Sequence, residues 1–257
     1  MTDPKRTILI TGAGGGLGRG LGLCLAAAGH SILATDLDAE SAQETASQII
    51  GAGGKAKWHA LDVGNEQAVT HFFEEIGESR IDVLVNNAGL QQVAKIEEFA
   101  TAKWDLLMQV MIRGAFLMTR AVLPGMRARG FGRVIHIGSI HSIVASPYKS
   151  AYVTAKHALI GFSKAIALET ADVDITSNSI CPAYIRTGLV DAQIADQARA
   201  LGISENEVIQ TVMLDRMPKK TFITCAEVAA SIEYLISPLS RNITGQAIGI
   251  DGGWTAQ

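Results

Sequence analysis

Short runs of β-branched and aliphatic residues alternate along this chain with longer segments whose apolar residues recur at helical spacing. Strands that alternate with helices indicate βαβ units, in which neighbouring strands are parallel and the crossovers are right-handed. The strands are apolar almost throughout, which predicts a sheet covered by helices on both faces. The sequence therefore predicts a doubly wound α/β fold. The predicted strands are residues 7–11, 31–35, 56–60, 82–86, 133–138, 174–180 and 247–251.

The length and the evenness of this pattern favour one domain over residues 1–257. No linker, low-complexity tract or repeat divides the chain. The alternation of strands and helices is interrupted once, by residues 187–223, a long helical insertion between two strands that contains scattered polar residues. Insertions of this kind often form lids over a binding site. A helical hairpin that only packs against the domain is the alternative.

The composition indicates an ordinary enzyme or binding domain, with 48% hydrophobic residues, 18% charged residues and a formal net charge of -3. A nucleic-acid partner would leave a basic surface, which this balance does not support. The three cysteines form no CxxC pair and are expected to be reduced thiols. No separate leader and no apolar run of membrane-spanning length is apparent, so we expect a cytoplasmic protein that has no membrane partner.

A glycine-rich turn, "TGAGGGLGRG", follows the first predicted strand and opens a helical segment. The spacing is TGxxxGxG, with glycines at Gly12, Gly16 and Gly18 and with Leu17 between the last two. A turn of this kind presents free backbone N–H groups at the positive end of a helix, where a pyrophosphate can bind. We therefore predict a dinucleotide at this turn.

Asp36 ends the second strand, in "ATDLD". A carboxylate there can accept hydrogen bonds from a ribose 2′-hydroxyl and would repel a 2′-phosphate, which favours NAD over NADP. Two alternatives stay open: Asp36 could only cap the following helix, and Asp38 could take the same role. Arg19 in the turn is a counter-indication, since an arginine can hold a 2′-phosphate.

Two further strand ends carry polar or small residues. "ALDV" supplies Asp62 and Val63 for the adenine, and "VNNAG" supplies Asn87, Ala88 and Gly89. The second segment could be only a turn. The carboxyl ends of parallel strands meet at one edge of a sheet, however, so a shared ligand crevice explains all of these ends together.

Tyr152 and Lys156 lie four positions apart in a helical segment and share one face of it. A phenol is a poor base near neutrality, but an adjacent ammonium and a cationic nicotinamide ring favour the phenolate and are expected to lower its pKa. Ser139, at the end of the fifth strand, would hold the substrate oxygen. Tyr148 has no lysine four residues on, so we choose Tyr152 as the general acid/base.

The segments TGxxxGxG, NNAG, Ser139 and YxxxK, in this order, resemble the short-chain dehydrogenase/reductase family, as do "CPAYIRT" and "ITGQAIGIDGGW". The resemblance covers essentially the whole chain. It implies one doubly wound Rossmann domain with a sheet of about seven strands, a nicotinamide cofactor and a homotetramer. It also implies that Lys156 binds the nicotinamide ribose and that Pro182, Ile185 and Thr187 line the nicotinamide pocket.

The chain departs from this family at one position. A segment resembling "VNLRG" usually supplies an asparagine that supports a proton-relaying water chain, whereas the segment here is "VMIRG". Met111 can neither donate a strong hydrogen bond nor hold that water. The departure puts the usual relay in doubt, and it leaves open a nucleotide-binding protein that has lost activity.

Several segments, including "NNAGLQQ", "GSIHSIVAS", "KSAYVTAKHALIGF" and "DGGWTA", look like the bacterial D-3-hydroxybutyrate dehydrogenases within this family. In that branch two glutamines, a histidine and a lysine surround the substrate carboxylate. The matching positions here are Gln91, His141, Lys149 and Gln193. Each of the four could instead be an ordinary surface or loop residue. The other enzymatic interpretation is a reductase of a different carbonyl, such as a sugar, a diol or a 3-ketoacyl thioester.

No His, Cys or Asp cluster has the spacing of metal ligands, so we expect no catalytic metal.

Overall fold

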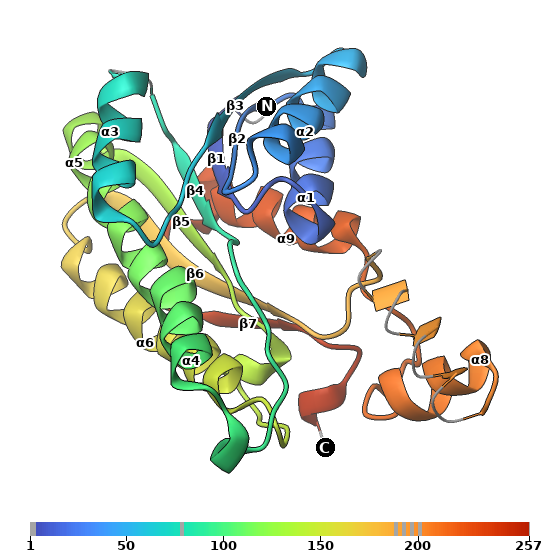
Figure 1. The fold of residues 1–257 in the computed structure, drawn as a ribbon. Helices are drawn as coiled ribbons and strands as arrows, with labels where there is room; N and C mark the ends of the chain where they lie inside the picture. The colour runs from blue at the N-terminus through green and yellow to red at the C-terminus, as the bar shows by residue number, and fades with distance from the viewer. Residues whose placement is uncertain are drawn as a thin grey trace.

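The computed structural model describes residues 4–77, 80–187, 190–191, 194–195, 198–199 and 202–256. Its centre is a parallel seven-stranded sheet in the order β3-β2-β1-β4-β5-β6-β7, with helices on both faces (Figure 1). The strand order reverses between β1 and β4, which is where open α/β sheets bind their ligands. The predicted doubly wound fold is confirmed. The strands are β1 Thr7–Thr11, β2 Ser31–Asp36, β3 Lys55–Ala60, β4 Val83–Asn86, β5 Phe131–Ile137, β6 Asp174–Pro182 and β7 Ala247–Ile250.

The helices begin and end at residues with identifiable capping roles. Asp38 caps α2 by accepting from the N–H groups of Glu40 and Ser41, and Gly130, with φ 67°, ends α5 in the left-handed region. Between α4 and α5 the chain continues as a π-helical turn, Gln109–Arg113. The helices are α1 Gly16–Ala27, α2 Ala39–Gly51, α3 Glu66–Ile76, α4 Thr101–Met108, α5 Gly114–Arg129, α6 Ser150–Glu169, α8 Glu205–Val208 and α9 Cys225–Ile236.

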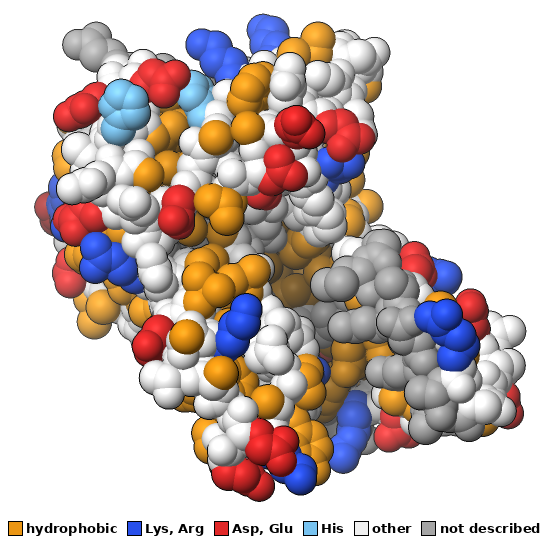
Figure 2. Space-filling view, viewed as in Figure 1, with side chains coloured by type: hydrophobic (Ala, Val, Ile, Leu, Met, Phe, Trp, Pro, Cys, Tyr) orange, Lys and Arg blue, Asp and Glu red, His pale blue; other side chains and the backbone are white. Residues whose placement is uncertain are grey.

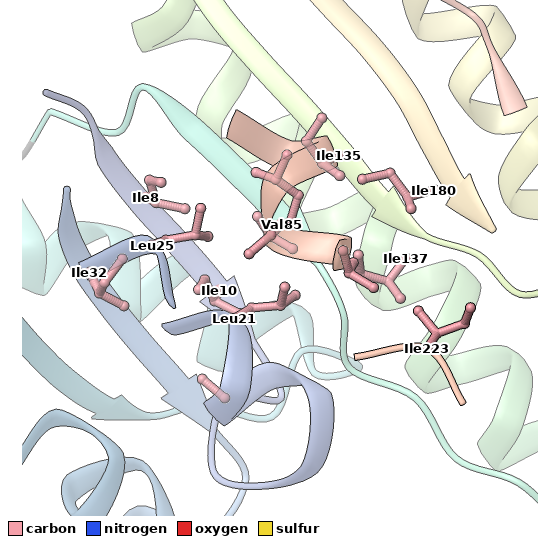
Figure 3. Close-up of a cluster of buried hydrophobic side chains, with 14 of the residues drawn as sticks. Ile8, Ile10, Leu21, Leu25, Ile32, Val85, Ile135, Ile137, Ile180 and Ile223 are labelled. Carbon is pink, nitrogen blue, oxygen red and sulfur yellow. The ribbon is translucent and has the colours of Figure 1, made fainter. Parts of the chain in front are cut away.

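Each face of the sheet buries its own hydrophobic core. Alternate residues of a strand point to opposite faces, so Ile8 and Ile10 of β1 pack with Leu21 and Leu25 of α1 (Figure 3), whereas Leu9 packs on the other face. The core that contains Leu9 also holds residues of α3 and α5. Burial on both faces explains why the strands read as nearly continuous apolar runs.

The outer strand β3 is unlike the central ones, because its burial pattern is mostly exposed. It pairs with β2 alone, through a register that sets Ser31 opposite Lys55 and Leu33 opposite Lys57. The two lysines lie two positions apart, so they project from the same face of the strand. This edge of the sheet is therefore cationic.

The predicted insertion leaves and re-enters the domain at one point. A short bridge pairs Ile185 with Ile223, and the Ile223 N–H donates to the Tyr184 carbonyl at 2.9 Å. Within the insertion, Ser204 and Glu207 form a capping box at the start of α8. Figure 2 shows the surface hollowed between the body of the domain and the part that carries α8, with hydrophobic side chains in the hollow.

One helical run has the length and apolar character of a membrane span, namely Thr101–Arg129, contrary to the expectation that no such stretch exists. In the fold this run packs against the domain instead. Leu117, Met118 and Met126 of its second half are buried in the core beneath the sheet. The run is apolar because one of its sides faces that core.

Candidate active site

Two cavities lie at the carboxyl edge of the sheet. One, of about 620 Å³, lies at the ends of β1, β2 and β4, and the other, of about 430 Å³, lies at the ends of β5 and β6 beside α6. They share the wall residues Leu17, Asn87, Gly89 and Leu90, so together they form one elongated crevice.

Every residue predicted to bind the cofactor lines this crevice. The residues predicted to bind the adenosine end of the cofactor line the larger cavity. Those predicted to bind the nicotinamide end line the smaller cavity. The larger is lined by Gly12, Gly18, Asp36, Asp62, Val63 and Ala88, the smaller by Gly16, Tyr152, Lys156, Pro182, Ile185 and Thr187, and both by Leu17, Asn87 and Gly89.

The glycine turn is shaped so that only glycine fits at its key positions. Gly12 has φ +63°, and a Cβ on it would lie 2.8 Å from the Ala88 Cα. A Cβ on Gly18 would lie 2.0 Å from the Gly12 carbonyl oxygen. The first turn of α1 has no capping side chain, so its N–H groups face the crevice free to bind an anion. The turn therefore fits the pyrophosphate of a dinucleotide.

Asn87 fastens this turn to the neighbouring strand. Its side-chain amide donates to the carbonyl oxygens of Thr11 and Gly12, at 2.9 Å each, and its N–H donates to the Thr11 hydroxyl at 3.0 Å. The sequence "VNNAG" is thus part of the crevice wall and also holds the glycine turn in place.

Asp36 faces the larger cavity and is not the helix cap. One carboxylate oxygen accepts from the Gly14 N–H at 2.8 Å and the other from the Asp38 N–H at 3.1 Å. Asp38 caps α2 instead. Arg19 lies beside this turn, where its guanidinium donates to the Gly14 carbonyl and forms an ion pair with Glu44 at 2.7 Å, and it lines neither cavity.

Ser139, Tyr152 and Lys156 meet in the smaller cavity. The Ser139 hydroxyl accepts from the His141 N–H at 3.2 Å and is hydrogen-bonded to the Tyr152 phenol. The Lys156 ammonium lies 5.5 Å from the centroid of the Tyr152 ring and donates to the Ile137 carbonyl at 2.6 Å. Tyr148, by contrast, is exposed and lies outside the cavity wall.

The expected lowering of the phenol pKa is not produced by the residues of the chain alone. Burial raises the pKa of Tyr152, and its hydrogen bond with Ser139 opposes this rise. Burial also lowers the pKa of Lys156 to about 8. The Lys156 ammonium donates to the Ile137 carbonyl and lies 5.5 Å from the centroid of the phenol ring. In the protein without a bound group, the balance of these effects raises the pKa of Tyr152.

The same cavity carries residues predicted to hold a carboxylate, and one of them, His141, lies beside Tyr152 with 6.2 Å between the ring centroids. Gln91, His141 and Lys149 line this cavity, with the Lys149 Nζ 3.4 Å from the His141 Nε2. Burial lowers the pKa of Lys149. Gln193, the fourth predicted residue, lies outside the described residues.

Two aromatic residues of this region were missed by the sequence analysis. Tyr184 lines the cavity, and its ring stacks on Trp254 at 6.0 Å with 29° between the planes. Both lie in segments that carried the family resemblance, "CPAYIRT" and "DGGW", so their position was the available signal. Their contact joins residues far apart in the chain, and no local pattern encodes it.

Met111 is buried, with 2% of its surface exposed. It lies in the π-helical turn and packs with Leu107, Ala151 and Ala155 in an apolar cluster that also contacts Tyr152. A side chain that would hold relay water in related proteins is here replaced by an apolar contact behind the predicted acid/base residue.

Among the residues that the structure describes, no group of three or more His, Cys, Asp or Glu side chains could hold a metal ion.

Comparison with known proteins identifies the family. The model for short chain dehydrogenases matches residues 6–198. The D-beta-hydroxybutyrate dehydrogenase of Rhizobium meliloti is 41% identical over 98% of this chain and 99% of its own length, and the enzyme of the same name from Cupriavidus necator is 38% identical over 98% of both. The chain belongs to the short-chain dehydrogenase family. It is therefore an oxidoreductase of a family that binds a nicotinamide cofactor.

Solved structures share the fold but differ in name. A putative gluconate dehydrogenase from Agrobacterium tumefaciens has a TM-score of 0.91 at 30% identity, covering 100% of this chain and 98% of that one. A putative 2-deoxy-D-gluconate 3-dehydrogenase from the same organism, with bound NADP, has a TM-score of 0.86 at 31% identity, covering 100% and 99%. These solved structures thus share the fold of this chain, and their names give sugar acids as substrates.

Proposed function

We propose that this protein is an NAD-dependent dehydrogenase that interconverts 3-hydroxybutyrate and acetoacetate. The observation that carries the proposal is the position of Lys149, whose ammonium faces the same cavity as Ser139 and Tyr152. A small hydroxy acid offers little apolar surface, so its site must hold the carboxylate by charge and hydrogen bonds. The two relatives that are 41% and 38% identical support this choice.

Tyr152 is the general acid/base in this proposal. It takes the proton from the substrate hydroxyl during oxidation and returns it during reduction, while Ser139 holds the same oxygen by a hydrogen bond. The bound nicotinamide supplies the hydride acceptor, and its positive charge in the oxidised form favours the phenolate. Lys156 binds the nicotinamide ribose and adds its own charge beside the phenol.

The preference for NAD rests on Asp36 and on the position of Arg19. A 2′-phosphate bound at the end of β2 would lie beside the Asp36 carboxylate. Two negative charges in contact repel each other. Arg19, the cation that could compensate for that repulsion, is paired with Glu44. A related structure carries bound NADP, so the proposed preference for NAD rests on these side chains and not on the fold.

The test is a panel of secondary alcohols assayed with NAD and NADP: 3-hydroxybutyrate, gluconate, a 3-hydroxyacyl thioester and 2-butanol. We expect 3-hydroxybutyrate with NAD to have the highest kcat/KM. Equal or better oxidation of 2-butanol or gluconate would reject the proposal and favour a dehydrogenase of another carbonyl, which relatives such as a 3-oxoacyl-[acyl-carrier-protein] reductase of Thermotoga maritima, 31% identical, also exemplify.

Lys149→Ala provides the matched test of the carboxylate site. Loss of a charged partner of a desolvated carboxylate typically costs about 2–5 kcal/mol, so KM for 3-hydroxybutyrate should rise at least tenfold. The affinity for NADH should be nearly unchanged, since Lys149 lines only the smaller cavity. Lys164→Ala, on the same helix α6 but outside both cavities, is the control.

We further propose a homotetramer. Phe116, on the helix α5, is 42% exposed, and burial of such a side chain between copies would stabilise an assembly. Light scattering after size-exclusion chromatography tests this directly, and a monomer at micromolar concentration would reject it.

A further inference from the structure

The ammonium of Lys149 lies between two rings. Its Nζ is 3.4 Å from the His141 Nε2 and 5.9 Å from the centroid of the Tyr184 ring. His141 is only 4% exposed, while Lys149 is partly buried at the edge of the cavity. The position of the ammonium is therefore set by side chains behind it as well as by its own helix.

The contact with Lys149 fixes how the two nitrogens of His141 are used. An ammonium has three donors and no acceptor, so the Nε2 that faces it must accept and cannot carry a proton. The proton of the neutral ring is then on Nδ1. The other polar neighbour of the ring is the Val144 backbone, which favours a protonated ring nitrogen, and the buried Nδ1 is the nitrogen left to carry that proton. Burial, together with the charge of Lys149, lowers the pKa of His141 to about 4, which keeps the ring neutral near pH 7.

Trp254 connects the two rings. Its indole meets the edge of His141 at 6.0 Å between centroids and stacks on Tyr184 at 6.0 Å. It does not line either cavity, so it contacts the rings from behind. The Asp251 carboxylate holds the turn that carries it by accepting from the N–H groups of Gly253 and Thr255, each at 2.9 Å.

We propose that His141, Tyr184 and Trp254 form a bracket of rings that positions the ammonium of Lys149, and that His141 acts in it as a neutral hydrogen-bond acceptor. His141 is thus a positioning residue for Lys149 in the free protein, in addition to lining the cavity in which the substrate is proposed to bind. The identity of that substrate rests on the proposed function, whereas the bracket itself is a property of the free protein.

The charged and titratable groups around this pair leave Lys149 unneutralised. Tyr152 and His157 of α6 approach His141, and Tyr184 approaches Lys149 from the end of β6. In the part of the chain that the structure describes, Lys149 forms no ion pair with a carboxylate. An anionic substrate group therefore enters a site with a full positive charge and no internal counter-ion.

The first test needs no substrate. Nitrogen-15 NMR of the labelled protein at pH 7 should show His141 as the neutral ring protonated at Nδ1, with Nε2 accepting a hydrogen bond. Trp254→Leu should remove the signature of that hydrogen bond, while Trp254→Phe, which keeps a ring, should retain it. A proton on Nε2, or a charged imidazolium, in the unaltered protein would overturn the proposal whatever the substrate proves to be.

The second test separates positioning from catalysis. Trp254→Leu should raise KM for 3-hydroxybutyrate at least fivefold, with kcat changed less than twofold and with KM for 2-butanol unchanged. Trp254→Phe should restore most of the loss, and NADH affinity serves as the check that each variant is folded. An unchanged KM in Trp254→Leu, or an equal rise for both substrates, contradicts the bracket. Failure of 3-hydroxybutyrate as a substrate would reject the proposed function and leave the NMR result to decide this inference.

Discussion

At the scale of single residues, the site depends on a few side chains whose neighbours restrict what they can do. Asp36 is the simplest case, because its two oxygens are held by the backbone of Gly14 and Asp38 while it faces the larger cavity. The carboxylate cannot rotate away from an incoming 2′-phosphate without losing these hydrogen bonds. In the proposed function, selectivity for NAD therefore depends on one fixed charge.

We expect the unaltered protein to prefer NAD over NADP by at least tenfold in kcat/KM, or about 1.4 kcal/mol. Asp36→Ala should narrow this gap by removing the repelling charge, and Asp38→Ala, which alters the cap of α2 outside the cavity walls, should leave it nearly intact. Steady-state kinetics with both cofactors measure the effect. Equal efficiency of NAD and NADP in the unaltered protein would show that Asp36 does not select.

Tyr152 is expected to carry the proton. Tyr152→Phe should lower kcat by on the order of 10²-fold or more, because it removes the only proposed group that exchanges a proton with the substrate oxygen. NADH affinity, measured by fluorescence titration, should change little. Tyr148→Phe is the control, since that residue is exposed and outside the cavity. A comparable loss in the control would mean that the wrong tyrosine was chosen.

At the scale of elements, the start of α1 illustrates how close packing creates a binding surface. The helix reaches the glycine turn so closely that Gly18 has no room for a side chain. Gly18→Ala should therefore displace the turn, weaken NADH binding at least tenfold and lower the thermal midpoint. Gly22→Ala, one turn further along α1, meets only ordinary contacts of 3.5 Å or more and should be tolerated. If both variants bind NADH equally well, the turn does not depend on this contact.

The strand boundaries were predicted from the sequence to within a few residues. The remaining differences show which contacts a local sequence pattern does not encode. The pattern predicted strands at 133–138 and 174–180, whereas β5 begins at Phe131 and β6 continues to Pro182. Both extensions come from pairing between distant segments, such as Pro182 opposite Ile250, which no local period encodes. For the same reason the residues Lys149 and His141 could be predicted from the sequence, but the direction of the hydrogen bond between them could not.

At the scale of the whole molecule, buried histidines link stability to pH. His136 is fully buried between the Asn86 amide and the Ser177 hydroxyl, and burial lowers its pKa to about 3. In the unfolded chain its pKa returns to about 6.5. The unfolded chain therefore binds a proton that the folded chain excludes, so the free energy of unfolding falls as the pH drops from about 6.5 towards 3.

Urea unfolding at pH 7.5 and pH 5 checks this linkage. The unaltered protein should be less stable at pH 5, and His136→Gln should show a smaller difference between the two pH values even if its stability at pH 7.5 is lower. His71→Gln is the control, because that side chain is 81% exposed. An identical pH dependence in His136→Gln and the unaltered protein would contradict the role given to His136.

The cationic edge at β3 has a consequence for how copies of this chain can add to one another. A bare strand edge is a template onto which a further strand can dock, and repetition of that step produces fibres. A second β3 docked against the first would bring the lysines Lys55 and Lys57 of both copies together, and their mutual repulsion opposes the contact. Docking of two β3 edges on each other is therefore disfavoured, so the two lysines act against one of the ways in which a bare sheet edge aggregates.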